Sequence, residues 1–266
     1  MPFRPEPSLP ADAPAQTAVL LCNLGTPDEP TAPALRRYLA EFLSDPRVVE
    51  IPAAIWKPIL YGAILPTRPA KSAAKYASIW TPEGSPLQVW TTKQATLLRG
   101  FLGERGHHVT VRHAMRYGNP SIPQVLDELK AAGHGRILIL PLYPQYSGTT
   151  TASVFDAVYA WGKQVRSIPE LRFVNRYPDH AGYIRALARC ISTHWQHFGR
   201  PDKLVMSFHG VPARTRTLGD PYFDECQQTA HLLVQQLNLR PEQYQLTFQS
   251  RFGKAEWLQP YTQPTV

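Results

Sequence analysis

His209 stands where a strand-like run of residues ends, and this position makes it the first candidate for chemistry. The run, residues 203–208, reads Lys-Leu-Val-Met-Ser-Phe, and a turn that begins at Gly210 follows it. A side chain at the carboxyl end of a parallel strand faces the ligand crevice. An imidazole there can accept a proton near neutral pH or ligate a transition metal. A histidine that only bonds within its own turn is the simpler alternative, and the other motifs of the chain decide against it.

Residues 140–151 combine prolines, tyrosines and small hydroxyl residues, in the order Leu-Pro-Leu-Tyr-Pro-Gln-Tyr-Ser-Gly-Thr-Thr-Thr. The pattern predicts a strand, a turn bracketed by prolines and the start of a helix. Ser and Thr at a helix start cap backbone amides, and that end of a helix attracts anions. Tyr143 and Tyr146 supply aromatic faces and hydroxyls that can line a pocket. An ordinary capped turn is the alternative.

Arg116 lies at the end of another expected strand, before Tyr117. Its planar guanidinium can hold a carboxylate through two parallel hydrogen bonds. A surface salt bridge explains an arginine there equally well.

Cys190, His194 and His197 share one face of an expected helix at a spacing that suits metal ligands. The helix is amphipathic and no partner ligand is implied, so the pattern favours a helix surface over a native metal site. The Walker loop, the Gly-x-Gly-x-x-Gly pattern and the Gly-x-Ser-x-Gly elbow do not occur in the sequence. Nucleotide-dependent and serine-hydrolase chemistry therefore lose their main support.

Strand-like runs alternate with helical patterns along the chain, which indicates parallel α/β units. A boundary near residues 148–154 would divide the chain into a disordered lead-in (1–16), a first α/β lobe (17–150) and a second (151–266). A cleft between two such lobes is a usual place for a ligand. The expected strands are residues 17–24, 109–116, 137–142, 171–175, 203–208 and 243–249, and the expected helices are residues 34–43, 123–132, 152–164, 180–198 and 221–237.

The segment of residues 51–66, from Ile51 to Pro66, is apolar, rich in aromatic residues and interrupted by prolines. As a core helix it would be broken at Pro58, because proline removes a helix hydrogen bond. The alternative is an exposed hydrophobic lip for a membrane or a flat apolar ligand. We call residues 51–66 the lip segment.

The composition narrows the partners and the location. The net charge of +8, from 28 basic and 20 acidic residues, suits a small anionic ligand or an anionic membrane surface. It favours nucleic acid least, because no nucleic-acid module is visible. No apolar run has the length of a membrane span. The proline-rich start lacks a hydrophobic signal core and predicts a cytoplasmic protein, for which association with a membrane surface stays open. Three scattered cysteines predict no disulfide framework, and two of them are expected as core thiols.

Six motifs, in this order along the chain, resemble the ferrochelatase family, which inserts Fe²⁺ into protoporphyrin IX. The similarity covers residues 18–262 and implies an α/β fold of two Rossmann-like lobes with parallel sheets and the porphyrin in the cleft between them. It implies a lyase of haem biosynthesis that uses no cofactor beyond its substrate Fe²⁺. The motifs are residues 20–27, 84–94, 114–120, 140–154, 207–212 and 247–262.

The resemblance also implies roles for single residues. His209 matches the family's active-site histidine, which would accept pyrrole protons and ligate Fe²⁺. The other matches, all to the porphyrin pocket, are Leu24, Arg116, Tyr117, Tyr143 and Ser147. The pocket would hold a bent macrocycle at a strain of about 1–5 kcal/mol, and the helix start at residues 149–153 would attract the propionates. The lip segment corresponds to the cleft mouth and could dock on a membrane or collect porphyrin from it.

The chain departs from the family pattern near its end. The glutamate that the family places opposite the histidine would lie beyond Val266, and Glu256 falls inside a different motif, so the role is not transferred to it. The sequence therefore resembles a ferrochelatase with a shortened second lobe. We expect these 266 residues to metallate protoporphyrin slowly or not at all, and to expose an apolar sheet edge and helix-packing faces. The alternatives are a non-catalytic porphyrin- or haem-binding protein, a chelatase for another metal or tetrapyrrole, and, less favoured, a periplasmic solute binder.

Overall fold

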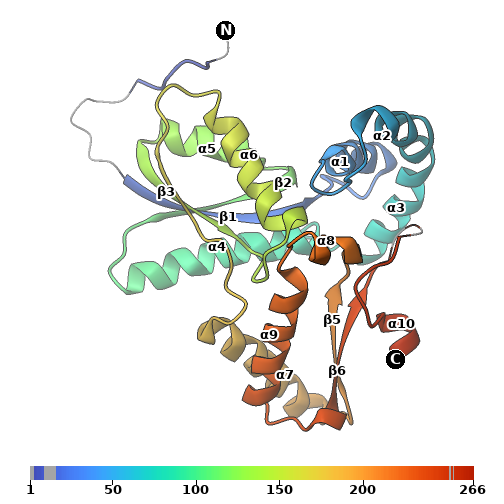
Figure 1. Cartoon of the computed structure of the whole chain (residues 1–266). Coiled ribbons are helices and arrows are strands. Elements are labelled where there is room, and N and C mark those ends of the chain that lie inside the picture. The colour runs from blue at the N-terminus through green and yellow to red at the C-terminus, as the bar shows by residue number, and fades with distance from the viewer. Residues whose placement is uncertain (1–2, 9–15, 252, 254) are drawn as a thin grey trace. The chain divides into compact units, whose positions relative to one another are not determined.

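The computed structural model describes residues 3–8, 16–251, 253 and 255–266 (Figure 1). Its contacts divide the chain into two units, which are described separately. The first unit comprises Met1–Leu142 and Gly148–Asn175, and the second comprises Tyr143–Ser147 and Arg176–Val266.

The first unit is built on a four-stranded parallel sheet with the order β2-β1-β3-β4. The central strand β1 is apolar and almost entirely buried, as expected for a parallel strand that is covered on both faces. Because β2 and β3 flank β1 on opposite sides, chain order reverses at the β1–β3 boundary, where open α/β sheets bind ligands. The strands are β1 (Gln16–Thr26), β2 (Thr110–Gly118), β3 (His134–Pro141) and β4 (Glu170–Phe173).

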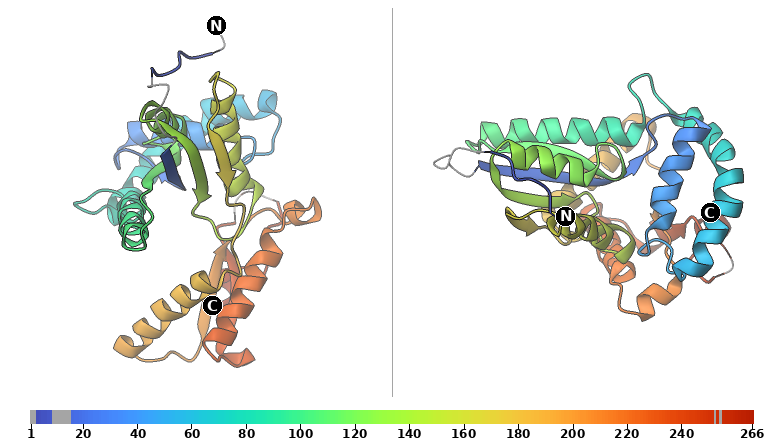
Figure 2. Two further views of the ribbon diagram at one scale, coloured as in Figure 1. Left: turned by 90° about the vertical axis from the view of Figure 1, so that its left-hand side faces the viewer. Right: turned by 90° about the horizontal axis from the view of Figure 1, so that it is seen from above.

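Helices cover both faces of this sheet (Figures 1 and 2). On one face, Ala95 of α4 (Pro86–Glu104) packs against Leu21 and Val111. On the other face lie α5 (Ile122–Ala131) and α6 (Ser153–Gly162), which follows a π-helical turn, Gly148–Ala152. Helix α1 (Ala32–Ser44) packs beside the carboxyl ends of β1 and β2, where its Leu35 and Tyr38 contact Tyr117.

The lip segment is helical and exposed, which supports the second of its two interpretations. Helix α2 (Ala53–Ile59) passes through a π-helical turn, Leu60–Ile64, into α3 (Leu65–Ile79). The expectation that Pro58 would break a helix here is therefore wrong. Pro58 lies one residue before the end of α2, and the chain remains helical through the wider π turn that follows. Buried side chains anchor the segment at Leu60 and Leu65, whereas Ile51, Ile55, Ile59 and Tyr61 are 44–59% exposed.

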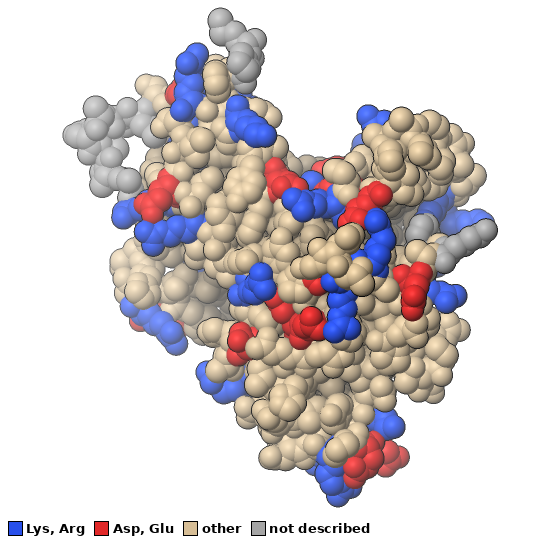
Figure 3. Space-filling model, in the orientation of Figure 1, with Lys and Arg blue, Asp and Glu red and all other residues tan. Residues whose placement is uncertain are grey.

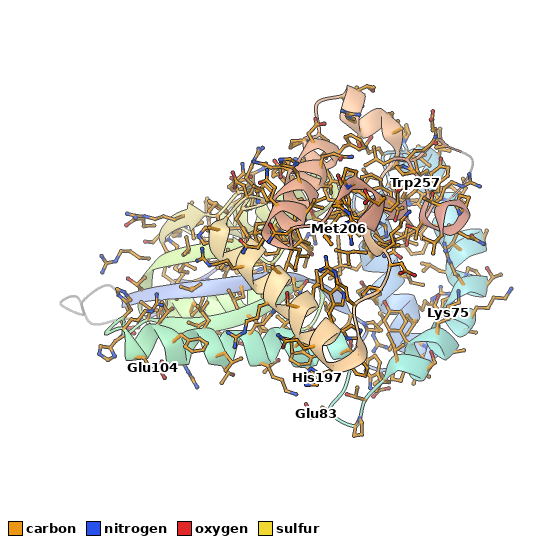
Figure 4. The ribbon with its side chains drawn as sticks, turned by 90° about the horizontal axis from the view of Figure 1, so that it is seen from below. Lys75, Glu83, Glu104, His197, Met206 and Trp257 are labelled. Atoms are coloured by element: carbon orange, nitrogen blue, oxygen red, sulfur yellow. The ribbon has the colours of Figure 1, made fainter. Side chains whose placement is uncertain are left out.

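The second unit has a two-stranded parallel sheet, β5 (Leu204–His209) and β6 (Tyr244–Gln249), covered on one face by α7 (Ala181–Phe198) and α9 (Tyr222–Gln236). Helices α7 and α9 lie side by side (Figure 2). Met206, labelled in Figure 4, lies with Leu246 and Phe248 of β6 in the hydrophobic core of this unit. Because side chains alternate along a strand, Ser207, His209 and Thr247 point to the opposite face. Short helices are α8 (Ala213–Thr217), a 3₁₀ turn (Pro241–Gln243) and α10 (Thr262–Thr265).

The division between the units differs from the boundary expected after residue 150. Helix α6 and strand β4 stay with the first unit because β4 extends its sheet, with Leu171 opposite Ile137. The described part of the expected disordered lead-in, residues 3–8, makes defined contacts: Arg4 pairs with Asp127 and donates its backbone N–H to the carbonyl oxygen of Gln164 at 2.8 Å. The remainder of residues 1–15 lies outside the described residues.

Two of the three cysteines are core thiols, as predicted. Cys22 and Cys226 are fully buried, and burial raises the pKa of the Cys226 thiol to about 12, whereas Cys190 is exposed. Within the described part of the chain, no helix combines the length and apolar composition that crossing a membrane requires. Basic and acidic side chains are interspersed on the face shown in Figure 3.

Candidate functional site

His209 ends β5 with an exposed side chain beside Gln249 of β6. Its Nδ1 lies 2.7 Å from the carbonyl oxygen of Gly210. A carbonyl oxygen only accepts hydrogen bonds, so in the neutral imidazole Nδ1 carries the proton and Nε2 has the lone pair. That lone pair is what proton acceptance or metal ligation requires. The turn thus selects the chemically useful tautomer of the imidazole.

Gly210 allows the chain to turn directly after the histidine. Its N–H donates to the carbonyl oxygen of Gln249 at 2.7 Å. A Cβ at this position would lie 2.9 Å from that oxygen and 3.3 Å from the ring of Trp257, which is labelled in Figure 4. A larger residue would therefore press against Gln249 and Trp257 and disturb the turn that follows His209.

Residues 256–258 support this turn from the side. The N–H of Leu258 donates to the carbonyl oxygen of Val211 at 3.0 Å, and the N–H of Ala213 donates to that of Glu256 at 2.9 Å. The exposed carboxylate of Glu256 accepts a hydrogen bond from Gln259 at 3.0 Å. Its observed contacts are thus those of a surface residue that supports the turn through its backbone.

The turn after β3 is held by α9. The N–H of Tyr146 donates to Glu225 at 2.7 Å, and the amide of Gln145 donates to Thr229 at 2.9 Å. Glu225 also pairs with Arg176 at 2.6 Å, and the Arg176 guanidinium lies 5.2 Å from the centre of the Tyr146 ring. The proline-bracketed turn is therefore fixed by buried charge-assisted hydrogen bonds.

Within this turn Tyr143 is half-buried, and Ser147 is only 1% exposed. The hydroxyl of Ser147 donates to Asp220 at 3.1 Å, and Asp220 also accepts the N–H of Tyr222 at 3.0 Å. Ser147 thus ties the turn to the start of α9. A contact of Tyr143 or Ser147 with a porphyrin stays a prediction.

The first unit carries the other predicted pocket residues at the carboxyl ends of β1 and β2. Leu24 is half-buried and packs against the cluster that contains Tyr38 and Tyr117. Tyr117 is fully buried, and Arg116 lies with its guanidinium carbon 4.5 Å from the centre of the Tyr117 ring. The strand ends bring these three predicted residues into one region of the unit. Their contact with a porphyrin stays a prediction.

Arg116 and Tyr117 meet at a buried carboxylate, Asp45, which follows α1. Its Oδ2 accepts hydrogen bonds from Arg116 Nη2 at 2.6 Å, from the Tyr117 hydroxyl at 2.7 Å and from the Ser153 hydroxyl at 2.5 Å. Burial by itself would raise the pKa of the Asp45 carboxyl, but hydrogen bonds from Ser153, Tyr117 and the N–H of Arg47, with the Arg116 charge, hold it below its ordinary value. Asp45 is therefore ionised at neutral pH.

No motif in the sequence marks Asp45, Ser153 or Glu225 as a functional residue. Asp45 lies 71 residues from Arg116 and 108 from Ser153 in the sequence, so no local pattern links them. The only sequence signal for such a carboxylate was Arg116 at a strand end, because a buried guanidinium needs a carboxylate partner.

The histidine pair on α7 forms local contacts. His197 Nδ1 lies 2.7 Å from the carbonyl oxygen of Thr193, and the His194 ring packs 4.6 Å from that of Phe198, measured between centres. Among the described residues, no group of three or more His, Cys, Asp or Glu side chains is placed to hold a metal ion.

The fold and the site define an α/β enzyme whose strand-end histidine can act as a base or metal ligand. Comparison with known proteins gives the family, because the ferrochelatase family profile matches residues 16–266. The chain is 68% identical to the ferrochelatases of Polaromonas sp. strain JS666 and Methylibium petroleiphilum, over 100% of this chain and 74% and 73% of those proteins. It is 65% identical to that of Janthinobacterium sp. strain Marseille, over 100% of this chain and 72% of that protein.

The chain belongs to the ferrochelatase family, the lyases that insert iron into protoporphyrin. The predicted family, activity and α/β fold with parallel sheets are confirmed. The chain spans about three quarters of the length of these relatives.

Proposed function

We propose that His209 is the proton acceptor and the iron ligand when Fe²⁺ enters protoporphyrin IX. Insertion replaces two pyrrole N–H protons by one Fe²⁺, so the two protons must leave as the four Fe–N bonds form. The Nε2 lone pair can take one proton at a time and return it to water, or bind Fe²⁺ as it sheds its hydration shell. The observation that carries this role is the 2.7 Å contact between Nδ1 and the Gly210 carbonyl oxygen, which in the neutral imidazole places the lone pair on Nε2. We expect no resident cofactor, since Fe²⁺ is itself the substrate.

The strand ends of the first unit are proposed to hold the macrocycle through Leu24 and Arg116, with the buried Tyr117 ring supporting the Arg116 guanidinium. Leu24 offers an apolar surface, and Arg116 offers a cation whose Nη1 bonds to no residue that the structure describes. Tyr143 and Ser147 are proposed to contribute from the second unit. Contacts remote from the pyrrole nitrogens can offset the strain of bending the ring, about 1–5 kcal/mol.

Absorbance titration of the 266-residue protein with protoporphyrin IX, with and without Fe²⁺ under anaerobic conditions, tests this function. We expect the porphyrin spectrum to shift on binding, and the free-base bands to convert slowly to those of the metalloporphyrin when Fe²⁺ is added. Zn²⁺ serves as a redox-inert second metal. Binding without conversion would favour a porphyrin-binding protein, and an unchanged spectrum would contradict the proposal altogether.

The lip segment is proposed to contact an anionic membrane surface. Ile51, Ile55 and Ile59 are exposed on it. Basic residues lie on the same helical run: Lys57, Arg68, Lys71 and Lys75, the last of which projects from α3 in Figure 4. Exposed apolar side chains beside cations are typical of peripheral membrane segments. The cytoplasmic location stays a prediction.

Flotation with lipid vesicles tests this contact. We expect the protein to float with vesicles that contain phosphatidylglycerol, and less at high salt, because each basic residue near the surface contributes about 1 kcal/mol that salt screens. Ile55→Glu should reduce flotation, whereas Ile168→Glu, which changes an equally exposed isoleucine (56% against 59%) outside the lip segment, should not. Protein that stays unbound at low salt would rule out the membrane contact.

A further inference from the structure

Asp45 collects more hydrogen bonds than any role in chain folding at the end of α1 would need. Besides the three bonds to Oδ2, its Oδ1 accepts the N–H of Arg47 at 2.8 Å. The side chain is 4% exposed. The donors come from β2, from the start of α6 and from the residues that lead into the lip segment. One carboxylate therefore joins three parts of the first unit.

The bonds around Asp45 fix the plane of the Arg116 guanidinium. Nε donates to the Ser153 hydroxyl at 2.7 Å and to the Ser153 carbonyl oxygen at 2.9 Å, while Nη2 donates to Asp45. The Ser153 hydroxyl accepts a hydrogen bond from Arg116 and donates its own O–H to Asp45. Two of the three guanidinium nitrogens therefore bond to protein atoms, and the Arg116 side chain stays 18% exposed. Nη1, which bonds to no described residue, is the nitrogen left for a substrate acceptor.

We propose that Asp45 is a positioning residue for metallation: its carboxylate orients Arg116 and Tyr117 so that the free edge of the guanidinium meets the tetrapyrrole. The inference rests on the proposed function, which assigns Arg116 to the macrocycle with Tyr117 packed against it. Asp45 itself reaches no substrate atom in this scheme. It acts by holding Arg116 in one orientation before the porphyrin arrives, which lowers the ordering cost of binding.

The substitution Asp45→Asn tests the inference with little change in shape. An asparagine offers one acceptor oxygen and an NH₂ group where the site supplies four donors, so Arg116 would lose its fixed orientation. We expect protoporphyrin binding, followed by fluorescence quenching, to weaken about tenfold, the change that loss of one charge-assisted hydrogen bond produces. Under turnover the KM for protoporphyrin should rise while the KM for the metal stays unchanged.

A double-mutant cycle shows whether Asp45 acts through Arg116. The double variant Asp45→Asn/Arg116→Ala should bind protoporphyrin no more weakly than Arg116→Ala alone. Asp127→Asn is the matched control, because Asp127 is a carboxylate of the same unit that bonds Trp161 at 2.7 Å outside the site. It should lower the melting temperature and leave binding unchanged. Should Asp45→Asn fail to fold, Ser153→Ala removes the bridging hydroxyl without changing a charge and should weaken binding in the same direction.

The outcomes separate this inference from the function on which it rests. Weaker binding by Arg116→Ala with normal binding by Asp45→Asn and Ser153→Ala would overturn the positioning role and leave the proposed function standing. Effects that multiply in the double variant would also overturn it, because Asp45 would then act independently of Arg116. Normal binding by Arg116→Ala would overturn the assignment of Arg116 to the macrocycle, and the positioning role with it.

Discussion

Substitution of His209 by asparagine is expected to slow metallation by about 10²–10⁴-fold, the range that one general acid–base group contributes. Asparagine keeps an N–H that can donate to the Gly210 carbonyl oxygen, as Nδ1 does at 2.7 Å. It has no basic nitrogen in place of Nε2. The substitution therefore removes the proton acceptor and metal ligand while preserving the turn. The measurement is the initial rate of zinc or iron insertion into protoporphyrin, with binding measured separately.

Binding of free protoporphyrin should change little in this variant, because the lost nitrogen acts on the metal and the protons. His231→Ala is a suitable control, since His231 is exposed on α9 in the same unit and contacts Gln235 at 2.9 Å. Its rate should match that of the unsubstituted protein. A variant at His209 that metallates at the normal rate would show that water or another group takes the pyrrole protons. Lost binding with normal turnover per bound porphyrin would instead make His209 a pocket residue.

Among the helices, local sequence patterns predicted those whose burial is one-sided. Helix α5 was expected at residues 123–132 and spans Ile122–Ala131, because its apolar residues share a single face. Helix α4 was not predicted. Its Trp90, Leu97 and Phe101 are 58–64% exposed while Ala95 on another side is buried, so the apolar residues show no single face along the sequence.

The residues of the site also differ in whether local sequence could predict them. His209 was predictable because a strand, a histidine and a glycine turn are adjacent in the sequence. The Asp45 network could not be predicted, because Arg116 and Ser153 are far from Asp45 in the sequence. Only the folding of the sheet and the position of α6 bring them to Asp45. An ionised carboxylate after a helix looks the same in the sequence whether it is solvated or buried. Only the fold shows that it faces a guanidinium and two hydroxyls.

Substitution of Gly25 by alanine should be the most damaging single change to the first unit. Gly25 pairs with Tyr117 across β1 and β2. An added Cβ would lie 1.7 Å from the Tyr117 carbonyl oxygen, and the backbone φ of +107° disfavours any side chain. The strands would have to separate where Leu24, Arg116 and Tyr117 meet. We expect a loss of at least about 4 kcal/mol in the free energy of unfolding, and porphyrin binding should fall with it.

Gly84→Ala separates the two causes of the lost stability, which are the strain of a positive φ and the clash of an added Cβ with the backbone. Gly84 has a similar φ of +117°, but nothing lies within 4 Å of an added Cβ. Its substitution adds only the backbone strain, about 1–2 kcal/mol, which lowers the melting temperature by about 2–8 °C. Gly25→Ala should lower it by about 8 °C or more, measured by circular dichroism on heating. Equal shifts would mean that β1 and β2 relax around the new methyl group, and that the close approach of the two strands at Gly25 contributes little to the stability of the site.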